Sequence, residues 1–498
     1  MIRFSAWDRT LAKSSYGLSM MAAVGSLVAC ATRGPDADAV AASEVHERLR
    51  SSAYVADDSV RVPPTRGIQA YGVFGPNETT FPRRGGSYVD PVFGSTVRRI
   101  TAEFPYPAGN DIYSKNGFWN ADGTLMFHGA ASGAKTIVST LTGATKCAFV
   151  PGNFDGSFDP VDPDTWYWFE EGGTRLRRFS VAKCRDVESV NLGRPLGGLG
   201  GSVDWIDASG QYMVLNLAGV IRVVKKIAGV PATLPTARSI YAGAPVPASV
   251  GGGWIGISPD GNYVVTNSED GYQSYALEHP SATMGAGVRF WTLCGGHGDL
   301  VSASDRRTYL VTFDCHGQDV VNDIELGAAV YAVDVTNGAT DDPAGISRQR
   351  EPPNRKLFGL ASWNDADGHF SGVSKGRLRD WVFVSIESSD DAFGVGVDSF
   401  WTRPYTQEII MTNAITGEVR RLAHHRSRGV NDNYRHQPRV SAGWGDCSGV
   451  PVAWASNFGQ MRKDRQGRST GKPYTGYSDI YMIDLDGATV PADPSACP

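Results

Sequence analysis

The chain has 498 residues, with 47 lysines and arginines against 52 aspartates and glutamates, and hence a formal net charge of −5 at pH 7. This balance argues against nucleic acid as a partner of the whole surface, because such binding depends on clustered positive charge. Glycine at 59 residues, 28 prolines and 12 tryptophans favour an all-β architecture of many short strands joined by tight turns.

The N-terminal region predicts export and lipidation. A basic start precedes a short apolar stretch, and Leu27-Val-Ala-Cys30 has the form of a lipobox, so residues 1–30 are expected to be a lipoprotein signal peptide. An ordinary signal peptide with a chance cysteine is the alternative. Ala31 favours the outer membrane, by analogy with Gram-negative lipoproteins, and polar residues 31–88 indicate a flexible tether. We therefore expect a cell-envelope lipoprotein that faces the periplasm or the cell surface and is held to the membrane by its lipid anchor.

Repeated turns mark the strands that follow. Asp-Gly or Ser-Gly pairs between hydrophobic runs are hairpin signals, because glycine accepts the positive φ that tight turns demand. They end the phrases Trp119-Asn-Ala-Asp-Gly, Ile206-Asp-Ala-Ser-Gly and Ile257-Ser-Pro-Asp-Gly. A degenerate copy around Asp164-Thr-Trp-Tyr-Trp-Phe fills the double gap after the first copy, and three more copies follow. The array predicts a seven-bladed β-propeller over residues 89–487, with a C-terminal tail at 488–498.

The ends of the array predict how the ring closes. The phrase Thr96-Val-Arg-Arg-Ile-Thr resembles the outer strand Glu418-Val-Arg-Arg-Leu-Ala, but it precedes the first inner strand and has no blade of its own. The last blade, conversely, runs out of chain after its third strand. We therefore expect residues 96–101 to pair beside residues 480–485, which completes blade seven and removes two exposed sheet edges.

One short phrase opens three of the expected inner strands: His297-Gly-Asp-Leu-Val-Ser, His369-Phe-Ser-Gly-Val-Ser and His436-Gln-Pro-Arg-Val-Ser. Inner strands converge on the axis of a propeller, so the three imidazoles are expected in one funnel, with Lys115 at the same position of blade one. Neutral imidazoles suit a divalent metal such as zinc, nickel, copper, iron or manganese, and Gln437 could add an oxygen ligand. Two alternatives are metal-free acid–base groups and histidines that hydrogen-bond only backbone carbonyls and water.

The six cysteines after Cys30 suit disulfides in an oxidising compartment. Sequential pairing, one of several possible connectivities, would join Cys147 to Cys184, Cys294 to Cys315 and Cys447 to Cys497. The chain has no CxxC, no G-x-S-x-G elbow, no phosphate-binding loop and no dinucleotide fingerprint. These absences disfavour a cysteine–zinc site, a hydrolase of the elbow type and a nucleotide-dependent enzyme.

Cationic segments are expected above the funnel. His424, His425 and Arg426 lie where the chain crosses from blade six to blade seven, and residues 459–478 are rich in arginine and lysine. These positions favour an acidic polysaccharide or oligosaccharide as the ligand, with His424, His425 and Arg426 as substrate-binding residues. The alternative is that the charges are merely solvated.

Several phrases carry a family resemblance: Tyr113-Ser-Lys-Asn-Gly-Phe-Trp-Asn-Ala-Asp-Gly, His369-Phe-Ser-Gly, Arg420-Arg-Leu-Ala-His-His-Arg-Ser, and His436-Gln-Pro-Arg-Val-Ser followed by Trp454-Ala-Ser-Asn. With them the chain resembles the seven-bladed oligogalacturonate lyases, whose funnel holds a manganese ion on histidines and a glutamine. It is more loosely similar to propeller-shaped ulvan lyases, which use histidine, tyrosine and arginine. The resemblance covers residues 90–485 and departs from the pectin enzymes in blade four, where Gly253 stands in the histidine column and no counterpart of their catalytic histidine is found.

The resemblance implies β-elimination on a uronate-containing polysaccharide or oligosaccharide. That reaction needs a positive group to neutralise the carboxylate, a base for the neighbouring proton and an acid for the leaving oxygen. We expect the metal or Arg439 in the first role, Tyr113 and Lys115 as base and acid, and His128 as a further base candidate. The alternative function is a non-catalytic propeller of the cell envelope that binds a ligand or a protein.

Overall fold

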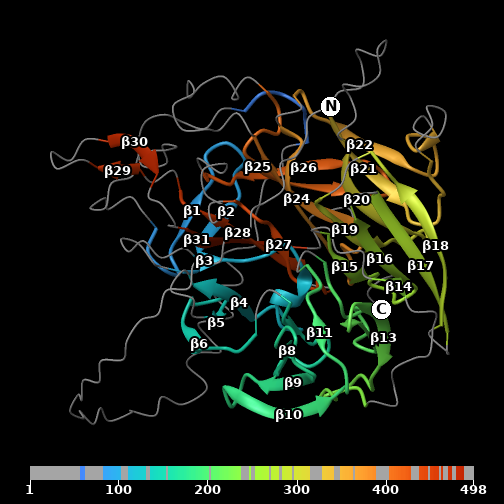
Figure 1. Ribbon diagram of the computed structural model, residues 1–498. Helices are drawn as coiled ribbons and strands as arrows, with labels where there is room; N and C mark the ends of the chain where they lie inside the picture. Colours follow the sequence, from blue (N-terminus) through green and yellow to red (C-terminus); the bar gives the residue numbers. More distant parts are fainter. Residues whose placement is uncertain are drawn as a thin grey trace, which may run out of the picture. The chain divides into compact units, whose positions relative to one another are not determined.

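A computed structural model gives the arrangement of the chain (Figure 1). It describes residues 56–61, 82–101, 110–130, 135–152, 155–200, 203–236, 246–247, 253–268, 271–279, 283–293, 296–314, 328–340, 348–362, 365–388, 403–427, 437–446, 449–458, 461–463, 469–473 and 478–486. All of them belong to one compact unit, residues 45–498. Within these ranges no helix is long and apolar enough to cross a membrane.

Seven antiparallel sheets follow one another along the chain, one for each blade. Blade one consists of β3 (Asn110–Asp111), β4 (Leu125–Ala130), β5 (Lys135–Ser139) and β6 (Thr145–Cys147), and blade two of β7 (Ser157–Phe158), β8 (Thr165–Phe169), β9 (Arg175–Ser180) and β10 (Arg185–Asn191). Blade three consists of β11 (Leu196–Gly197), β12 (Tyr212–Leu217), β13 (Val220–Lys225) and β14 (Val246–Pro247), and blade four of β15 (Ile255–Ile257), β16 (Tyr263–Ser268), β17 (Gly271–Glu278) and β18 (Thr283–Trp291).

Blades five to seven carry the histidine phrases. Their strands are β19 (Gly298–Ser302), β20 (Thr308–Asp314), β21 (Ala329–Asp334) and β22 (Arg355–Gly359); β23 (Asp367–Gly372), β24 (Trp381–Glu387), β25 (Glu408–Asn413) and β26 (Val419–His424); and β27 (Ser441–Ala442), β28 (Gly449–Ser456), β31 (Asp479–Asp486), β2 (Thr96–Arg99) and β1 (Ser87–Val89). A separate hairpin pairs β29 (Met461–Lys463) with β30 (Ser469–Pro473). The predicted seven-bladed propeller is confirmed, and the degenerate copy supplies β8 and β9.

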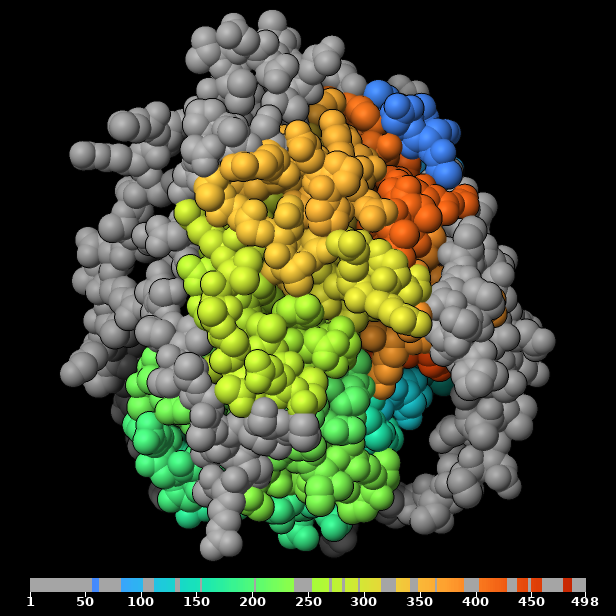
Figure 2. All heavy atoms as spheres, turned by 90° about the vertical axis from the view of Figure 1, so that its right-hand side faces the viewer, coloured from blue at the N-terminus to red at the C-terminus, as the bar shows by residue number. Residues whose placement is uncertain are grey.

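The hydrophobic core lies between neighbouring blades. Central strands such as β12, β20 and β24 are buried at every position, because the preceding blade covers one face of a blade and the following blade covers the other. Figure 2 shows blades four and five, in yellow-green and yellow, side by side on one face of the molecule. The Asp-Gly turns form as expected: Gly123 and Gly261 adopt φ values of 70° and 73°, where a side chain would be strained.

The ring closes through its N-terminal strand, as predicted. β2 pairs with β31, with Arg98 opposite Met482 and Arg99 opposite Tyr481. Beside this pairing the guanidinium of Arg99 forms a buried ion pair with Asp479, whose other oxygen accepts a hydrogen bond of 2.6 Å from the Thr101 hydroxyl. β1 pairs with β2 as a fifth strand, so the end of the predicted tether is part of blade seven.

A second part of the predicted tether contacts blade six. Residues 56–61 lie against β26, where the Nη1 atom of Arg421 donates to the backbone oxygens of Asp57 and Ser59 at 3.3 and 2.6 Å. The Nε2 atom of His424 lies 3.1 Å from the backbone oxygen of Arg61. We call residues 56–61 the N-terminal strap. Its contacts are specific and partly buried, so this stretch is ordered on the propeller.

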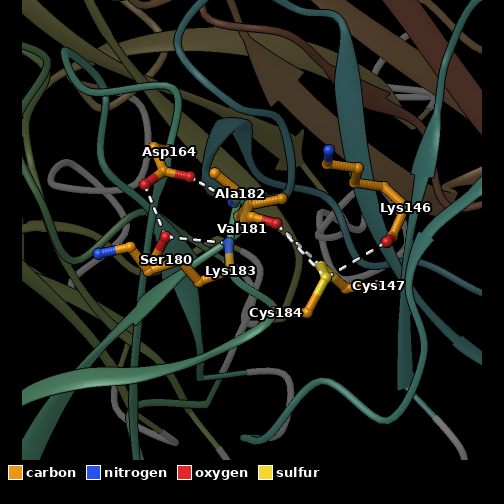
Figure 3. The surroundings of a disulfide bond; sticks show 8 residues. All are labelled: Lys146, Cys147, Asp164, Ser180, Val181, Ala182, Lys183 and Cys184. Carbon is orange, nitrogen blue, oxygen red and sulfur yellow. Dashed lines mark hydrogen bonds between the residues drawn. A yellow bond between two sulfur atoms is a disulfide. The ribbon is translucent and has the colours of Figure 1, made fainter. Parts of the chain in front are cut away.

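One disulfide joins blade one to blade two. Cys147, the last residue of β6, is bonded to Cys184 in the turn between β9 and β10. Figure 3 shows the turn held by Asp164, which accepts a hydrogen bond of 2.7 Å from the Ser180 hydroxyl. The first predicted pair is therefore confirmed. Cys294, Cys315, Cys447 and Cys497 lie outside the described residues, and so does the predicted lipidation site Cys30.

Candidate functional site

Two of the three predicted histidines meet at the axis. His297 stands just before β19, where its backbone oxygen accepts hydrogen bonds from the hydroxyls of Thr312 and Tyr272 at 2.6 and 3.3 Å. His369 is the third residue of β23, and its backbone nitrogen donates to the Ser385 hydroxyl at 3.2 Å. The two imidazole rings stack with centroids 4.0 Å apart and an angle of 30° between their planes.

Glycine is required immediately before His369. Gly368 has a φ of 139°, and a Cβ atom there would overlap the backbone oxygen of Ser385 on the partner strand. The close approach of β23 to β24 at this position therefore requires glycine.

A tyrosine and an arginine complete the cluster. The ring of Tyr113 meets the ring of His369 edge-on, with centroids 5.8 Å apart. The guanidinium of Arg439 lies over the Tyr113 ring, 4.8 Å from its centroid, and donates to the side-chain oxygen of Gln437 from Nε at 3.4 Å and Nη2 at 3.2 Å. We call Tyr113, His297, His369 and Arg439 the axial site. Its residues come from blades one, five, six and seven.

The axial site has an accessible side and a buried side. Tyr113 and His297 are partly exposed, whereas His369 and Arg439 have 1% and 0% of their surfaces exposed. The Nδ1 atom of His369 lies 3.0 Å from a carboxylate oxygen of Glu387, which is equally buried. Its Nε2 atom is buried and has no hydrogen-bond partner among the described residues. Such an atom is completed in proteins by water or by a ligand.

Both imidazoles are poised as neutral groups. Burial holds the pKa of His369 well below its usual range, and the positive charges of protonated His297 and of Arg439 lower it further. Burial also lowers the pKa of His297, although the carboxylate of Asp367 opposes this. At neutral pH both rings can therefore accept a proton rather than carry one.

A polar floor closes the axis below the axial site. The side-chain amide of Asn116 donates to the backbone oxygens of Gly372, Ala442 and Gly443 at 2.9 to 3.0 Å, which ties blade one to blades six and seven. Asp204 of blade three accepts from the backbone nitrogens of Asn116 and Gly117 at 2.9 and 2.7 Å. The floor holds the inner strands in register beneath the site.

Lys115 belongs to this floor. Its Nζ atom donates to the backbone oxygen of Gly156 at 2.8 Å, and burial lowers its pKa to about 8 although the carboxylate of Asp204 opposes the shift. Tyr113, two residues earlier, is the residue of blade one that contacts His369. The sequence predicts Lys115 at the position that the histidines occupy in blades five and six. The difference arises because a 3-10 turn, η1 (Asn116–Phe118), interrupts the first inner strand and changes its register.

The structure shows His128, His424, His425 and Arg426 in contacts other than those that define the axial site. His128 is buried on β4 and faces Asp479 of blade seven, which acts on its pKa. His424 packs against Phe93 and the N-terminal strap. The Nε2 atom of His425 lies 3.2 Å from the backbone oxygen of Ile386. Arg426 stacks on the rings of Tyr88 and Phe458. The last three residues are buried, so they hold the top of blade six together rather than face an open funnel.

The predicted metal site finds limited geometric support. An imidazole binds a metal along the lone pair in its ring plane, so two stacked rings do not direct their lone pairs to one point. The oxygen of Gln437 already accepts from Arg439, whose positive charge disfavours a cation beside it. The described residues thus do not fit an ion shared by His297, His369 and Gln437, and they contain no other group of metal-ligating side chains. His436 lies outside the described residues, so the three-histidine site stays a prediction that a metal analysis of the purified chain can test.

Sequence reasoning missed Glu387 and Asp367. The first ends β24 and the second begins β23, and the two pair directly across blade six. Neither belongs to a repeated phrase. The available signal was register: His369 lies opposite Ser385, so the residues two positions away on each strand, Asp367 and Glu387, share its face of the sheet.

Comparison with known proteins leaves the function open. No protein-family model and no curated protein matches the chain. The β-propeller domain of Cps50 (Swd1) from Myceliophteria thermophila is 11% identical at a TM-score of 0.35, over 75% of this chain and 98% of that chain. Hydrazine synthase from Kuenenia stuttgartiensis is 11% identical at a TM-score of 0.34, over 59% and 74%. Similarity this low carries no argument, so the class of the protein, a seven-bladed β-propeller, rests on its own strand pairing.

Proposed function

We propose that this protein is a polysaccharide lyase that cleaves uronate-containing polysaccharides or oligosaccharides by β-elimination at the axial site. The observation that carries the proposal is the meeting of Tyr113, His297, His369 and Arg439 at the axis from four different blades. A neutral imidazole, a phenol and a guanidinium are the three kinds of group that this reaction needs. The resemblance of the sequence to propeller-shaped uronate lyases points in the same direction.

The reaction needs no covalent link to the protein. A base removes the proton from the carbon beside the uronate carboxylate, and the electrons of that C–H bond form a carbon–carbon double bond. The C–O bond to the neighbouring sugar breaks at the same time, and the leaving oxygen takes a proton from the acid. One fragment then ends in an unsaturated uronate and the other in a new hydroxyl, with no water consumed.

Each role follows from burial and contacts. The Nε2 atom of His369 is the proton acceptor, because it is neutral and lacks a partner among the described residues. The hydroxyl of Tyr113, on the accessible side, donates to the leaving oxygen. The guanidinium of Arg439 lies against the face of the Tyr113 ring, where its charge offsets the negative charge that develops on the substrate, an effect that low dielectric strengthens. His297 forms the entrance and supports the His369 ring by stacking.

The proposal is tested by incubating the purified full chain with pectate, alginate, ulvan and glucuronan while recording the ultraviolet absorbance of the unsaturated uronate. We expect activity on at least one of them. The variants Tyr113→Phe, His369→Asn and Arg439→Ala should each lower kcat by about 10²–10³-fold, the usual effect of losing an acid–base group or an electrostatic donor.

The matched control is His279→Asn. His279 is an exposed histidine of blade four whose Nδ1 atom lies 3.0 Å from the hydroxyl of Tyr212, and it is not one of the residues of the axial site. This variant should retain kcat within about twofold, because surface substitutions away from a site have small effects. Absence of an unsaturated product from all four substrates, in a chain that unfolds cooperatively, would favour a binding propeller over a lyase.

A further inference from the structure

Glu387 contacts the axial site through the side chain of His369. It is the last residue of β24, and its Oε1 atom lies 3.0 Å from the Nδ1 atom of His369. Both residues are 1% exposed, so water competes little for this contact. The backbone of His369 is fixed independently, because its nitrogen donates to the Ser385 hydroxyl and Gly368 precedes it in a conformation that favours glycine. The contact therefore decides the chemical state of the ring rather than its place in the fold.

The chemistry of the two groups determines which one donates. An ionised carboxylate can only accept a hydrogen bond, whereas a neutral imidazole has one nitrogen that donates and one that accepts. A carboxylate at Nδ1 therefore holds the proton on Nδ1, and the lone pair of Nε2 is left free to accept. Without the carboxylate the proton could occupy either nitrogen of the ring. A ring that carries the proton on Nε2 could not accept a proton from a ligand at that nitrogen.

Another buried glutamate in blade six shows a different use of the same side chain. Glu408, the first residue of β25, is also 1% exposed, but both of its oxygens accept hydrogen bonds from the guanidinium of Arg421. Arg421 in turn holds the N-terminal strap, so this glutamate acts in a structural ion pair. Glu387 instead faces an imidazole whose second nitrogen lies in the axial site.

We propose that Glu387 is the positioning residue of the axial site, where it holds His369 in the Nδ1–H tautomer so that Nε2 can accept a proton from a ligand. The inference rests on the proposed function for the use that is made of Nε2. The tautomer itself does not depend on that function. In this arrangement Glu387 acts on the substrate through His369 and not by direct contact.

The tautomer can be measured directly in the full chain labelled with ¹⁵N-histidine. Protonated and unprotonated ring nitrogens have different ¹⁵N chemical shifts, and the signals of His369 are assigned by their loss in His369→Asn. We expect the Nδ1–H form in the wild type and in Glu387→Gln, because an amide oxygen still accepts from Nδ1. In Glu387→Ala the Nε2–H form should become a major species.

Kinetics provide the second measurement. Glu387→Ala should lower kcat by about 10–100-fold, as loss of an orienting partner does at other sites, with KM within about twofold, and Glu387→Gln should restore part of kcat. Glu408→Gln is the control: its melting temperature should fall, while the tautomer of His369 stays unchanged. A loss of kcat that tracked melting temperature in both glutamate variants would indicate a merely structural role and overturn the inference.

The two proposals fail separately. An Nε2–H tautomer in the wild type, or an unchanged tautomer and kcat in Glu387→Ala, overturns the positioning role whatever the protein does. If Glu387→Ala does not fold, the wild-type tautomer still decides. An Nδ1–H tautomer that depends on Glu387 in a protein without lyase activity would support the positioning role and remove the proposed function.

Discussion

At the scale of single residues, two buried histidines outside the axial site lower the free energy of unfolding at acidic pH. His128 and His424 are almost fully buried, and burial lowers the pKa of each to about 4, in spite of the nearby carboxylates of Asp479 and Asp90. In the unfolded chain both regain the ordinary value near 6.5. The unfolded chain therefore binds more protons than the folded one between these two pH values, and acid favours unfolding.

We predict that His128→Asn makes the stability of the protein less sensitive to acid. A lowered pKa contributes stability that is present above the unfolded value of 6.5 and is lost as the pH falls through 4. The loss amounts to about 3 kcal/mol for one residue over this window. Denaturant unfolding at pH 7, 5.5 and 4 should show a smaller decline in the variant by this amount.

The difference between the wild type and His128→Asn is independent of the other titrating groups. Burial raises the pKa of Asp204 to about 6 and that of Glu408 to about 7, so these carboxyls stabilise the fold as the pH falls and oppose the histidines. They are present in both proteins, so they cancel in the difference. Equal declines in both proteins would show that His128 takes up its proton without unfolding.

Sequence alone located part of the axial site at this scale. The repeated phrase identified His297 and His369, because a side chain at the start of an inner strand points to the axis in any propeller. It missed Glu387, whose role depends on pairing across β23 and β24. It placed Lys115 where Tyr113 lies, since the 3-10 turn in the first inner strand leaves no mark in the hydrophobic pattern. Long-range register decides such details, and a phrase within one strand does not contain it.

At the scale of elements, the sequence predicted the hairpin turns well and failed to predict which N-terminal segments pack on the propeller. Glycines at positive φ fixed the hairpins of the blades whatever their neighbours were. The N-terminal strap, by contrast, is polar and resembles a linker in composition, and its contacts with the buried side chains of Arg421 and His424 make it part of the fold. A linker and a docked segment differ in their partners, which lie hundreds of residues away in the chain.

We predict that the disulfide between blades one and two stabilises the ring. Cys147 and Cys184 are 37 residues apart in sequence, so the bond restricts the unfolded chain considerably. Replacing both by serine should lower the free energy of unfolding by about 2–4 kcal/mol. The measurement is denaturant unfolding without a reducing agent. Because the bond lies at a blade edge, kcat on the substrate of the wild type should be unchanged, and a matching loss of kcat would contradict a purely structural role.

At the scale of the whole molecule, closure is the property that the sequence predicted best. Residues 96–101 resemble the outer strand at residues 418–423, and blade seven lacked an outer strand of its own, so the prediction placed residues 96–101 there. The pairing of β2 with β31 confirms this prediction. With its first and last strands in one blade, the ring pairs the outer side of β31, which would otherwise be an exposed edge. The axial site depends on this, since Tyr113 follows β3 in the first blade while Arg439 precedes β27 in the last.

We predict that removal of residues 1–101 opens the ring and abolishes the axial site. The shortened chain would leave β31 as an exposed edge and Asp479 without the buried guanidinium of Arg99 and the hydroxyl of Thr101. Loss of one partner of a buried ion pair typically costs about 3–5 kcal/mol, and the unpaired edge invites aggregation. Size-exclusion chromatography should show aggregates, and thermal unfolding should lose cooperativity.

The control is a chain that lacks only residues 1–55. It keeps the N-terminal strap on Arg421, so it should remain monodisperse with a melting temperature within a few degrees of the wild type. A third chain without residues 1–62 separates the strap from the closing strand. Since Arg421 and Glu408 still pair in that chain, it should fold and lose only part of its stability. If the chain without residues 1–101 unfolded as cooperatively as these two, the prediction would be wrong. β2 would then not be needed for closure, and the contacts of the polar floor would suffice to hold the ring closed.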